Sequence, residues 1–265
     1  MGIVRVQAPT IAAATASATT ITNTFGSDIT AGSLLVAFAA GSSGATQTMS
    51  STGAPTWTKI AQFTETGGSG NDISIHYCLN APGGATTVTC TYSVSSSFRA
   101  LVVAEYSGVA TSAALDKNTT GLETAATSTP TDTAMVTTAN GELVVSALQF
   151  RNATSPASAG SGYSMIAVDQ ASGVGVDFGA EDQIQATAGS IAPTFTLTTA
   201  SAASAIMSAT FLPADAAAGF QFVPPKLSAM PGPPGMFSPA PWTADPPPAA
   251  PTDVPYVISQ YDGYF

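Results

Sequence analysis

Apolar and polar positions alternate in short blocks along residues 1–212 of this chain. Leu34–Phe38 and Leu101–Ala104 are fully apolar runs of strand length, a pattern typical of central strands covered on both faces. Thr86–Tyr92 instead alternates hydroxyl and apolar side chains, which predicts a strand with one face in water. No stretch shows helical periodicity with caps. We therefore predict an all-β fold, an antiparallel β-sandwich of jelly-roll-like type.

Turn-forming residues divide this part of the chain into thirteen expected strands. In the first half they are Ile3–Gln7, Thr19–Thr24, Leu34–Ala40, Trp57–Phe63, Ile73–Leu79, Thr86–Tyr92 and Ala100–Tyr106. In the second half they are Ala134–Thr138, Leu143–Phe150, Tyr163–Val168, Val176–Ala180, Thr194–Thr198 and Ala205–Leu212.

The β-rich region contains the same pattern twice. Three segments of the first half recur in the same order in the second half, 109, 107 and 105 positions later. Loops of different length produce a drift of this size, so three ordered matches indicate an internal repeat. The matched pairs begin at Gly32 and Gly141, at Thr87 and Thr194, and at Arg99 and Ser204.

These boundaries predict three parts of the chain. Residues 1–18 form an N-terminal segment, and residues 19–212 form a sandwich with pseudo-repeats at about 19–110 and 124–212. Residues 213–265 form an extended C-terminal arm rich in proline and aromatic residues. The two repeats form either one sandwich or two related small ones.

The amino-acid composition limits the kinds of molecule that the protein is expected to bind. Charged residues are 8% of the chain, against a usual value of about 25%, so the surface must be rich in hydroxyl groups. The net charge of −10 repels a phosphate backbone, and we expect no direct binding to nucleic acid. The sequence shows neither a signal-peptide pattern nor an apolar run long enough to span a bilayer. We expect a soluble protein made in the cytoplasm, with no membrane partner.

The two cysteines fall on the arms of an expected hairpin. Asp72–Asn80 and Ala85–Ser93 are predicted to pair about the turn at 81–84. Because side chains alternate faces along a strand, this pairing puts Cys78 and Cys90 on opposite faces, where no disulfide can bridge them. We predict two free thiols, as expected for a protein assembled in a reducing cytoplasm.

The sequence offers no convincing catalytic set, metal site or cofactor motif. His76 is the only histidine, and with Cys78 it supplies two ligands where a zinc site needs three or four. No Gly-x-Ser-x-Gly elbow, phosphate-binding loop or dinucleotide fingerprint is present. Glu105 is expected to face outward or to meet Arg99. We predict a protein that is not an enzyme and needs no cofactor.

Asp177, Glu181 and Asp182 form the densest acidic group. Paired carboxylates serve glycoside hydrolases or calcium sites, but adjacent residues on a strand point to opposite faces, and we favour a solvated loop. Trp57 and Tyr163 occupy matching places in the repeat and are expected to cap the core. Trp57 has an alternative role as a stacking platform for sugar. If the protein binds a ligand, Trp57, Asp177 and Glu181 are the expected contacts.

The composition changes abruptly at Pro213, because 13 of the 19 prolines lie from there onward. Proline removes amide donors and favours extended backbone, so this segment builds no sheet or helix of its own. We predict an arm that lies along a neighbouring subunit at low ordering cost, with a disordered tail as the alternative. The expected anchors are its aromatic residues: Phe220, Phe222, Phe237, Trp242, Tyr256, Tyr261, Tyr264 and Phe265.

Four segments together carry a resemblance to a known class of domain. They are Gly32–Phe38, Trp57–Ile60, Ile75–Cys90 and Ala104–Val109. In outline they resemble a β-sandwich domain common in structural proteins of tailed-bacteriophage virions, and the likeness covers about residues 19–212. The motifs are fold motifs and identify no active site.

What this resemblance implies is a non-enzymatic structural protein of the virion. The first expectation is a capsid decoration (cement) or minor capsid protein whose arm fastens it to neighbouring subunits. Its partners would then be major capsid or tail subunits, and a homo-oligomer, with a trimer as the guess, is expected. The alternative is a tail or fibre subunit that binds the host surface or a carbohydrate.

Overall fold

The computed structural model describes residues 2–42, 44–53, 56–66, 70–151, 157–169, 177–201 and 203–216. The chain divides into two compact units, Met1–Gln221 and Phe222–Phe265. The second unit, the predicted arm beyond Ala216 and all eight predicted aromatic anchors lie outside the described residues.

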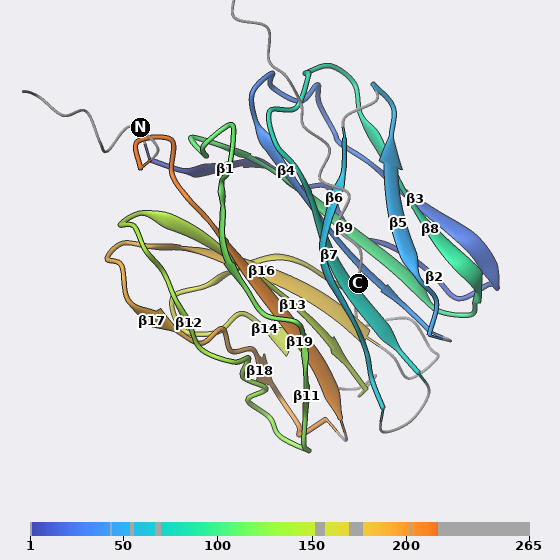
Figure 1. The fold of residues 1–265 in the computed structure, drawn as a ribbon. Coiled ribbons are helices and arrows are strands. Elements are labelled where there is room, and N and C mark those ends of the chain that lie inside the picture. The colour runs from blue at the N-terminus through green and yellow to red at the C-terminus, as the bar shows by residue number, and fades with distance from the viewer. Residues whose placement is uncertain are drawn as a thin grey trace, which may run out of the picture. The chain divides into compact units, whose positions relative to one another are not determined.

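The described residues are all-β and the sheets are antiparallel, which confirms the predicted fold class (Figure 1). The first large sheet has the order β1-β9-β4-β7-β6, with β2 beside β9. Its strands are β1 (Val4–Gln7), β2 (Ala12–Ala14), β4 (Leu34–Gly41), β6 (Thr58–Thr64), β7 (Asp72–Cys78) and β9 (Arg99–Ser107).

The second large sheet has the order β10-β19-β13-β16-β15, with β11 beside β19. Its strands are β10 (Leu115–Asn118), β11 (Leu122–Thr124), β13 (Glu142–Phe150), β15 (Ser164–Asp169), β16 (Asp177–Gln185) and β19 (Ser204–Phe211). The smaller elements are β3 (Ala18–Thr24), β5 (Gln47–Ser51), β8 (Thr87–Ser96), β12 (Met135–Val136), β14 (Ala157–Ser158), β17 (Ser190–Ile191) and β18 (Thr196–Leu197).

The internal repeat is visible in the topology. Each large sheet has a central strand, β4 or β13, between two long neighbours, and each carries one extra short strand at the equivalent place. The segments matched in sequence fall on β4 and β13, on β8 and β18, and on β9 and β19. The repeat found in the sequence therefore corresponds to a repeated order of strands in the two large sheets.

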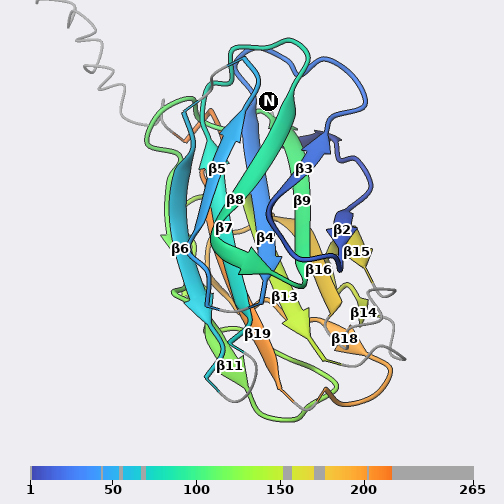
Figure 2. The ribbon, with the colours of Figure 1, turned by 90° about the vertical axis from the view of Figure 1, so that its right-hand side faces the viewer.

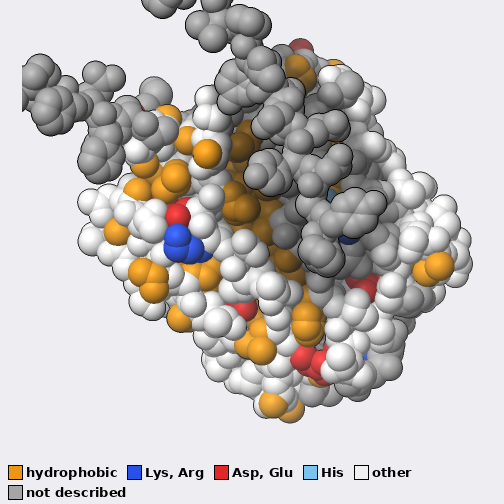
Figure 3. All heavy atoms as spheres, viewed as in Figure 1, with side chains coloured by type: hydrophobic (Ala, Val, Ile, Leu, Met, Phe, Trp, Pro, Cys, Tyr) orange, Lys and Arg blue, Asp and Glu red, His pale blue; other side chains and the backbone are white. Residues whose placement is uncertain are grey.

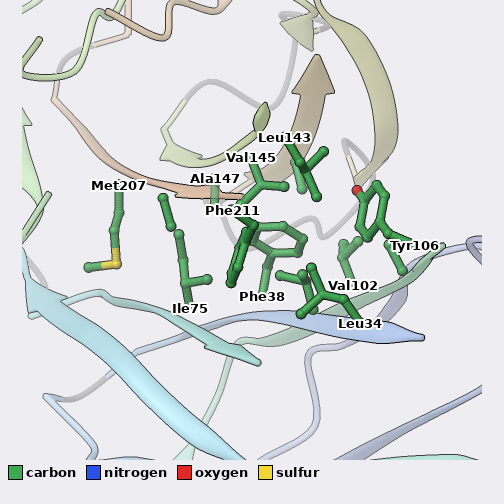
Figure 4. Close-up of a cluster of buried hydrophobic side chains, with 14 of the residues drawn as sticks. Leu34, Phe38, Ile75, Val102, Tyr106, Leu143, Val145, Ala147, Met207 and Phe211 are labelled. Carbon is green, nitrogen blue, oxygen red and sulfur yellow. The ribbon is translucent and has the colours of Figure 1, made fainter. Parts of the chain in front are cut away.

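The two large sheets face each other across a shared apolar core (Figure 4). Side chains at alternate positions of the central strands meet there, and the rings of Tyr77 and Phe211 make an edge contact at 5.5 Å. The best-buried members include Leu34, Phe38, Ile75, Val102, Tyr106, Leu143, Val145, Ala147, Met207 and Phe211. The two repeats thus share one core.

Each large sheet is also covered on its outer face. The three-stranded sheet β3-β8-β5 lies over the first large sheet (Figure 2) and encloses a second core. The short pairs β12-β17 and β14-β18 accompany the second sheet, where a third, smaller apolar cluster forms. This layering explains the fully apolar runs, because β4 and β13 are buried on both faces along their whole length.

All thirteen expected strands overlap observed ones, but the expected hairpin between Asp72–Asn80 and Ala85–Ser93 is wrong. β7 pairs with β4 and β6, whereas β8 pairs with β3 and β5 in another layer. The segment between them crosses from one sheet to the other through Gly83 and Gly84, both at positive φ. Strands that follow one another in the sequence often pair, but β7 and β8 lie in different layers because the first large sheet is covered on both of its faces.

The two thiols are free, as predicted, although for a different physical reason. Cys78 and Cys90 both lie in the second core, between the first large sheet and β3-β8-β5. They do not point to opposite sides of one hairpin. Burial raises the pKa of both thiols, that of Cys90 to about 12, so neither forms a reactive thiolate at neutral pH.

Candidate functional site

The single histidine lies on β7 and is buried. Its Nε2 lies 3.0 Å from the Ser74 hydroxyl, which in turn donates to the Gln47 side chain. Burial, with a smaller effect from Lys59, lowers the pKa of His76 to about 3, so the ring is neutral across the physiological range. No group of three or more His, Cys, Asp or Glu residues suited to a metal ion occurs among the described residues.

Glu105 neither faces outward nor meets Arg99. Its carboxylate is buried and accepts hydrogen bonds from Gln7 Nε2 (2.7 Å), Thr30 N (2.7 Å) and Ser33 Oγ (2.9 Å). Arg99 donates to the carbonyls of Ala16 and Thr20. Glu105 therefore links β9 to the loop that precedes β4. The sequence pattern predicts that this side chain faces outward or meets Arg99, whereas its role in the fold is structural.

The acidic group is not on a solvated loop. Asp177, Glu181 and Asp182 lie on β16, a strand paired on both sides, and all three are buried. The expected strand Val176–Ala180 ends too early, because the polar side chains of Glu181 and Asp182 interrupt the apolar alternation that identifies a buried strand. Their burial leaves Asp177 and Glu181 unable to contact a ligand at the surface.

Glu181 has a strongly raised pKa. It points away from the central core, opposite Ser146 of β13 in the sheet register, and is 0% exposed. Gly160 N donates to Glu181 Oε2 at 2.8 Å, while Oε1 has no hydrogen-bond partner among the described residues. Burial raises the pKa of Glu181 to about 8, and the neighbouring charge of Asp182 adds to the rise. The carboxyl is thus protonated at neutral pH.

Gly160 is required for this contact. A Cβ at this position would lie 1.8 Å from the Thr194 carbonyl oxygen, so only glycine lets the loop come close enough to donate to Glu181. The Tyr163 hydroxyl is also buried without a hydrogen-bond partner among the described residues. Burial raises its pKa, and Glu181 and Asp132 raise it further.

A second buried carboxyl lies on the same face of the second sheet. Asp132 accepts hydrogen bonds from Thr119 Oγ1 (2.8 Å) and Ser208 Oγ (2.7 Å), and Ser208 Oγ lies 3.0 Å from Ser146 Oγ. Burial raises the pKa of Asp132 against these hydrogen bonds. The row Ser208, Ser146 and Glu181 crosses three adjacent strands in register. These groups are closed to solvent, which identifies them as a structural polar cluster.

Asp182 points the other way, toward the seam between the two large sheets. Arg5 Nη1 lies 3.1 Å from Asp182 Oδ2, and the Tyr106 hydroxyl donates to the same oxygen at 2.7 Å. Burial raises the pKa of Asp182, while Tyr106 and Arg5 oppose the rise. The cluster ties β1 and β9 of the first sheet to β16 of the second. A cleft of about 170 Å³ opens beside it, lined by Arg5, Tyr106 and Asp182 among others.

A larger pocket of about 390 Å³ adjoins this cleft, since Ile184 lines both. We call it the root pocket and define it by Ile3, Ile184, Pro213, Ala216 and the turn at 139–141. Its described walls are mainly apolar, and Asp215 is the one ionisable side chain among them.

Trp57 is half-buried and packs against the second core, as a core cap would. Its indole N–H donates to Ser51 Oγ at 2.9 Å. Tyr163 is half-buried as well. On the face shown in Figure 3, charged side chains are few and hydrophobic side chains gather along the seam between the large sheets. The residues singled out by sequence therefore do not converge on one site.

No helix within the described ranges is long and apolar enough to cross a membrane. Comparison with protein-family models, with curated proteins and with solved structures finds no match to this chain.

Proposed function

We propose that this chain is a non-enzymatic structural protein of a tailed-bacteriophage virion, a capsid decoration or minor capsid protein that cements neighbouring subunits. The observation that supports it is that the potentially reactive side chains are buried in the β domain, whereas prolines and aromatic residues are concentrated in the C-terminal segment. The groups considered for a catalytic or metal role, namely His76, Cys78 and the acids of β16, are all buried within β layers. Segment 217–265 holds 12 of the 19 prolines and eight aromatic side chains.

This division suits a cementing role. A four-layered domain with a large shared core resists deformation, and its hydroxyl-rich surface presents few charges to neighbours. A segment rich in proline loses little conformational entropy when it lies along another subunit, and its aromatic side chains supply apolar contact area. Buried area added across subunit seams widens the free-energy gap between the assembled and disassembled particle. The partners we propose are major capsid or tail subunits, with a homo-oligomer, a trimer, as the assembling unit.

The test is incorporation into particles. Deletion of residues 219–265 in the phage that encodes the chain is expected to abolish incorporation while the truncated domain still accumulates in soluble form. A matched pair of full-length variants sharpens this test: Phe237→Ala with Trp242→Ala should reduce copy number several-fold, and Ser238→Ala with Thr243→Ala should not. Full occupancy of particles by the truncated protein would show that the arm is not a clamp.

Cryo-electron microscopy of tagged particles then locates the protein. Density at regular positions on the shell supports decoration and gives the copy number. Label confined to the tail tip contradicts it and favours the tail or fibre role. The structure gives no support to the carbohydrate-binding alternative, because Asp177 and Glu181 are buried and the Trp57 indole packs on the core.

A further inference from the structure

The root pocket lies where the described chain ends. Pro213 is bridged to Val109, Ala214 N donates to Gly108 O at 2.8 Å, and Ala216 N donates to Pro213 O at 3.0 Å. The first two contacts hold the backbone against the domain at Pro213 and Ala214, and the third closes a local turn that ends at Ala216, which lines the pocket. Whatever follows Ala216 in the chain starts at this wall.

The pocket presents apolar surface that the described part of the fold leaves uncovered. Ile184 is 44% exposed, and within the described residues β15 pairs with β16 no farther along the strand than Asp182. Ile3 and Pro213 extend this apolar wall, and the volume of about 390 Å³ is open to solvent. Because Ile3 and Pro213 are themselves buried, Ile184 is the exposed apolar side chain that an occupant of the pocket would cover.

The sequence supplies an occupant within reach. The first aromatic residue after Ala216 is Phe220, separated from it only by Ala217, Ala218 and Gly219. Four extended residues span at most about 14 Å, so the pocket lies within reach of a side chain at position 220. Such a short tether gives a local concentration in the millimolar range or above, which favours this side chain over any free ligand.

Charge disfavours an anionic occupant. Asp215 is the only ionisable side chain lining the described part of the pocket, and the whole chain carries a net charge of −10. An anionic ligand would be repelled, and the described lining offers no cluster of donors to bind a strongly polar one.

We propose that Phe220 of the same chain docks in the root pocket against Ile184 and Ile3 and so anchors the root of the arm. This inference rests on the proposed function for the role of the arm, but not for the docking itself. A fixed root sets the direction and reach from which the rest of the segment extends to a neighbour, because the ordering cost of the first residues has already been met within the monomer.

Thiol labelling of the full-length protein tests this docking. Ile184→Cys and Val94→Cys place a reporter thiol at two surface positions of similar exposure, 44% and 48%. Cys78 and Cys90 are buried and stay silent. We expect Ile184→Cys to react with an aromatic disulfide reagent at least 10-fold faster when Phe220→Ser is added. Phe220→Leu should preserve the slow rate, because leucine also fills an apolar pocket. Phe237→Ser should change neither reporter, and Val94→Cys should be indifferent to substitution of Phe220.

The labelling rates distinguish Phe220 of the same chain from other possible occupants of the root pocket. Equal labelling rates of Ile184→Cys with and without the added Phe220→Ser substitution overturn the proposal. Protection that is lost on dilution overturns it as well and assigns the pocket to the segment of a second copy. Because the assay uses isolated protein and no particle, it gives the same answer whether or not the protein is incorporated into virions. Failure of docking is therefore distinguishable from failure of the proposed function.

Discussion

Replacing Glu181 by glutamine should remove a pH dependence of stability built into the second sheet. The carboxyl has a pKa of about 8 in the folded protein against an ordinary value of 4.5, with burial as the main cause. Below pH 4.5 both states bind the proton. Between pH 4.5 and 8 only the folded state keeps it, so the free energy of unfolding falls as pH rises.

The magnitude follows from the shift of the pKa. Each unit corresponds to about 1.4 kcal/mol, so 3.5 units give a loss of at most about 5 kcal/mol between pH 4.5 and 8. Glutamine is nearly isosteric with the protonated acid and its oxygen still accepts from Gly160 N, so the variant should match wild type near pH 4.5. At pH 8 the variant should be more stable by several kcal/mol, because glutamine cannot ionise.

Urea unfolding at half-unit intervals from pH 4.5 to 8.5 measures this difference, since titrating groups that do not interact with Glu181 contribute equally to both proteins. The difference includes the electrostatic coupling of Glu181 to Asp182. Ser146→Ala, which changes the cross-strand neighbour of Glu181 and titrates nothing, is the control and should shift stability by the same amount at every pH. A wild-type minus variant difference that changes by less than about 1 kcal/mol across the range would refute the burial argument.

Three further predictions concern the cores. Phe211→Ala, at a 0%-exposed position between the large sheets, should lower the free energy of unfolding by about 3–5 kcal/mol in denaturant titrations, and an effect below about 1 kcal/mol would contradict the shared core. Cys78 and Cys90 should resist thiol reagents in native protein and react fully in denaturant, because both are buried; fast native labelling would place them elsewhere. Glu105→Ala leaves three donors unpaired and should cost about 1–3 kcal/mol or more at pH 7, whereas a neutral effect by calorimetry would indicate that water replaces the carboxylate.

Much of the secondary structure could be predicted from the sequence, because a strand is a local pattern. Alternation and fully apolar runs located β4, β9 and β13 to within a residue or two, and three ordered matches revealed the repeat that the strand order reproduces. The short strands β2, β5, β10, β11, β14 and β17 were missed. Two to five residues carry too little periodicity to identify a strand, and the pairing partner decides whether they form one.

The candidate sites were predictable only in part. Residue types and faces can be taken from the chain, so His76 and Cys78 were placed correctly on one face of one strand. The layer that packs against each face cannot be predicted in this way. An alternation with a period of two indicates that one face is buried, but it does not identify the segment that covers that face. Thus Asp177 and Glu181 were expected on a solvated loop, Glu105 at the surface, and β7 beside β8.

The order and kinds of residues are enough to predict a β-rich region with an internal repeat, few charges and a proline-aromatic segment after residue 212. Each of these follows from local spacing or from counts. Three further features appear only when the sheets are assembled: the two halves share one core, the acids of β16 are buried on opposite faces of an inner strand, and an apolar pocket opens at Ala216. These depend on contacts between residues far apart in the chain, which form when sheets pack face to face and which no local pattern encodes.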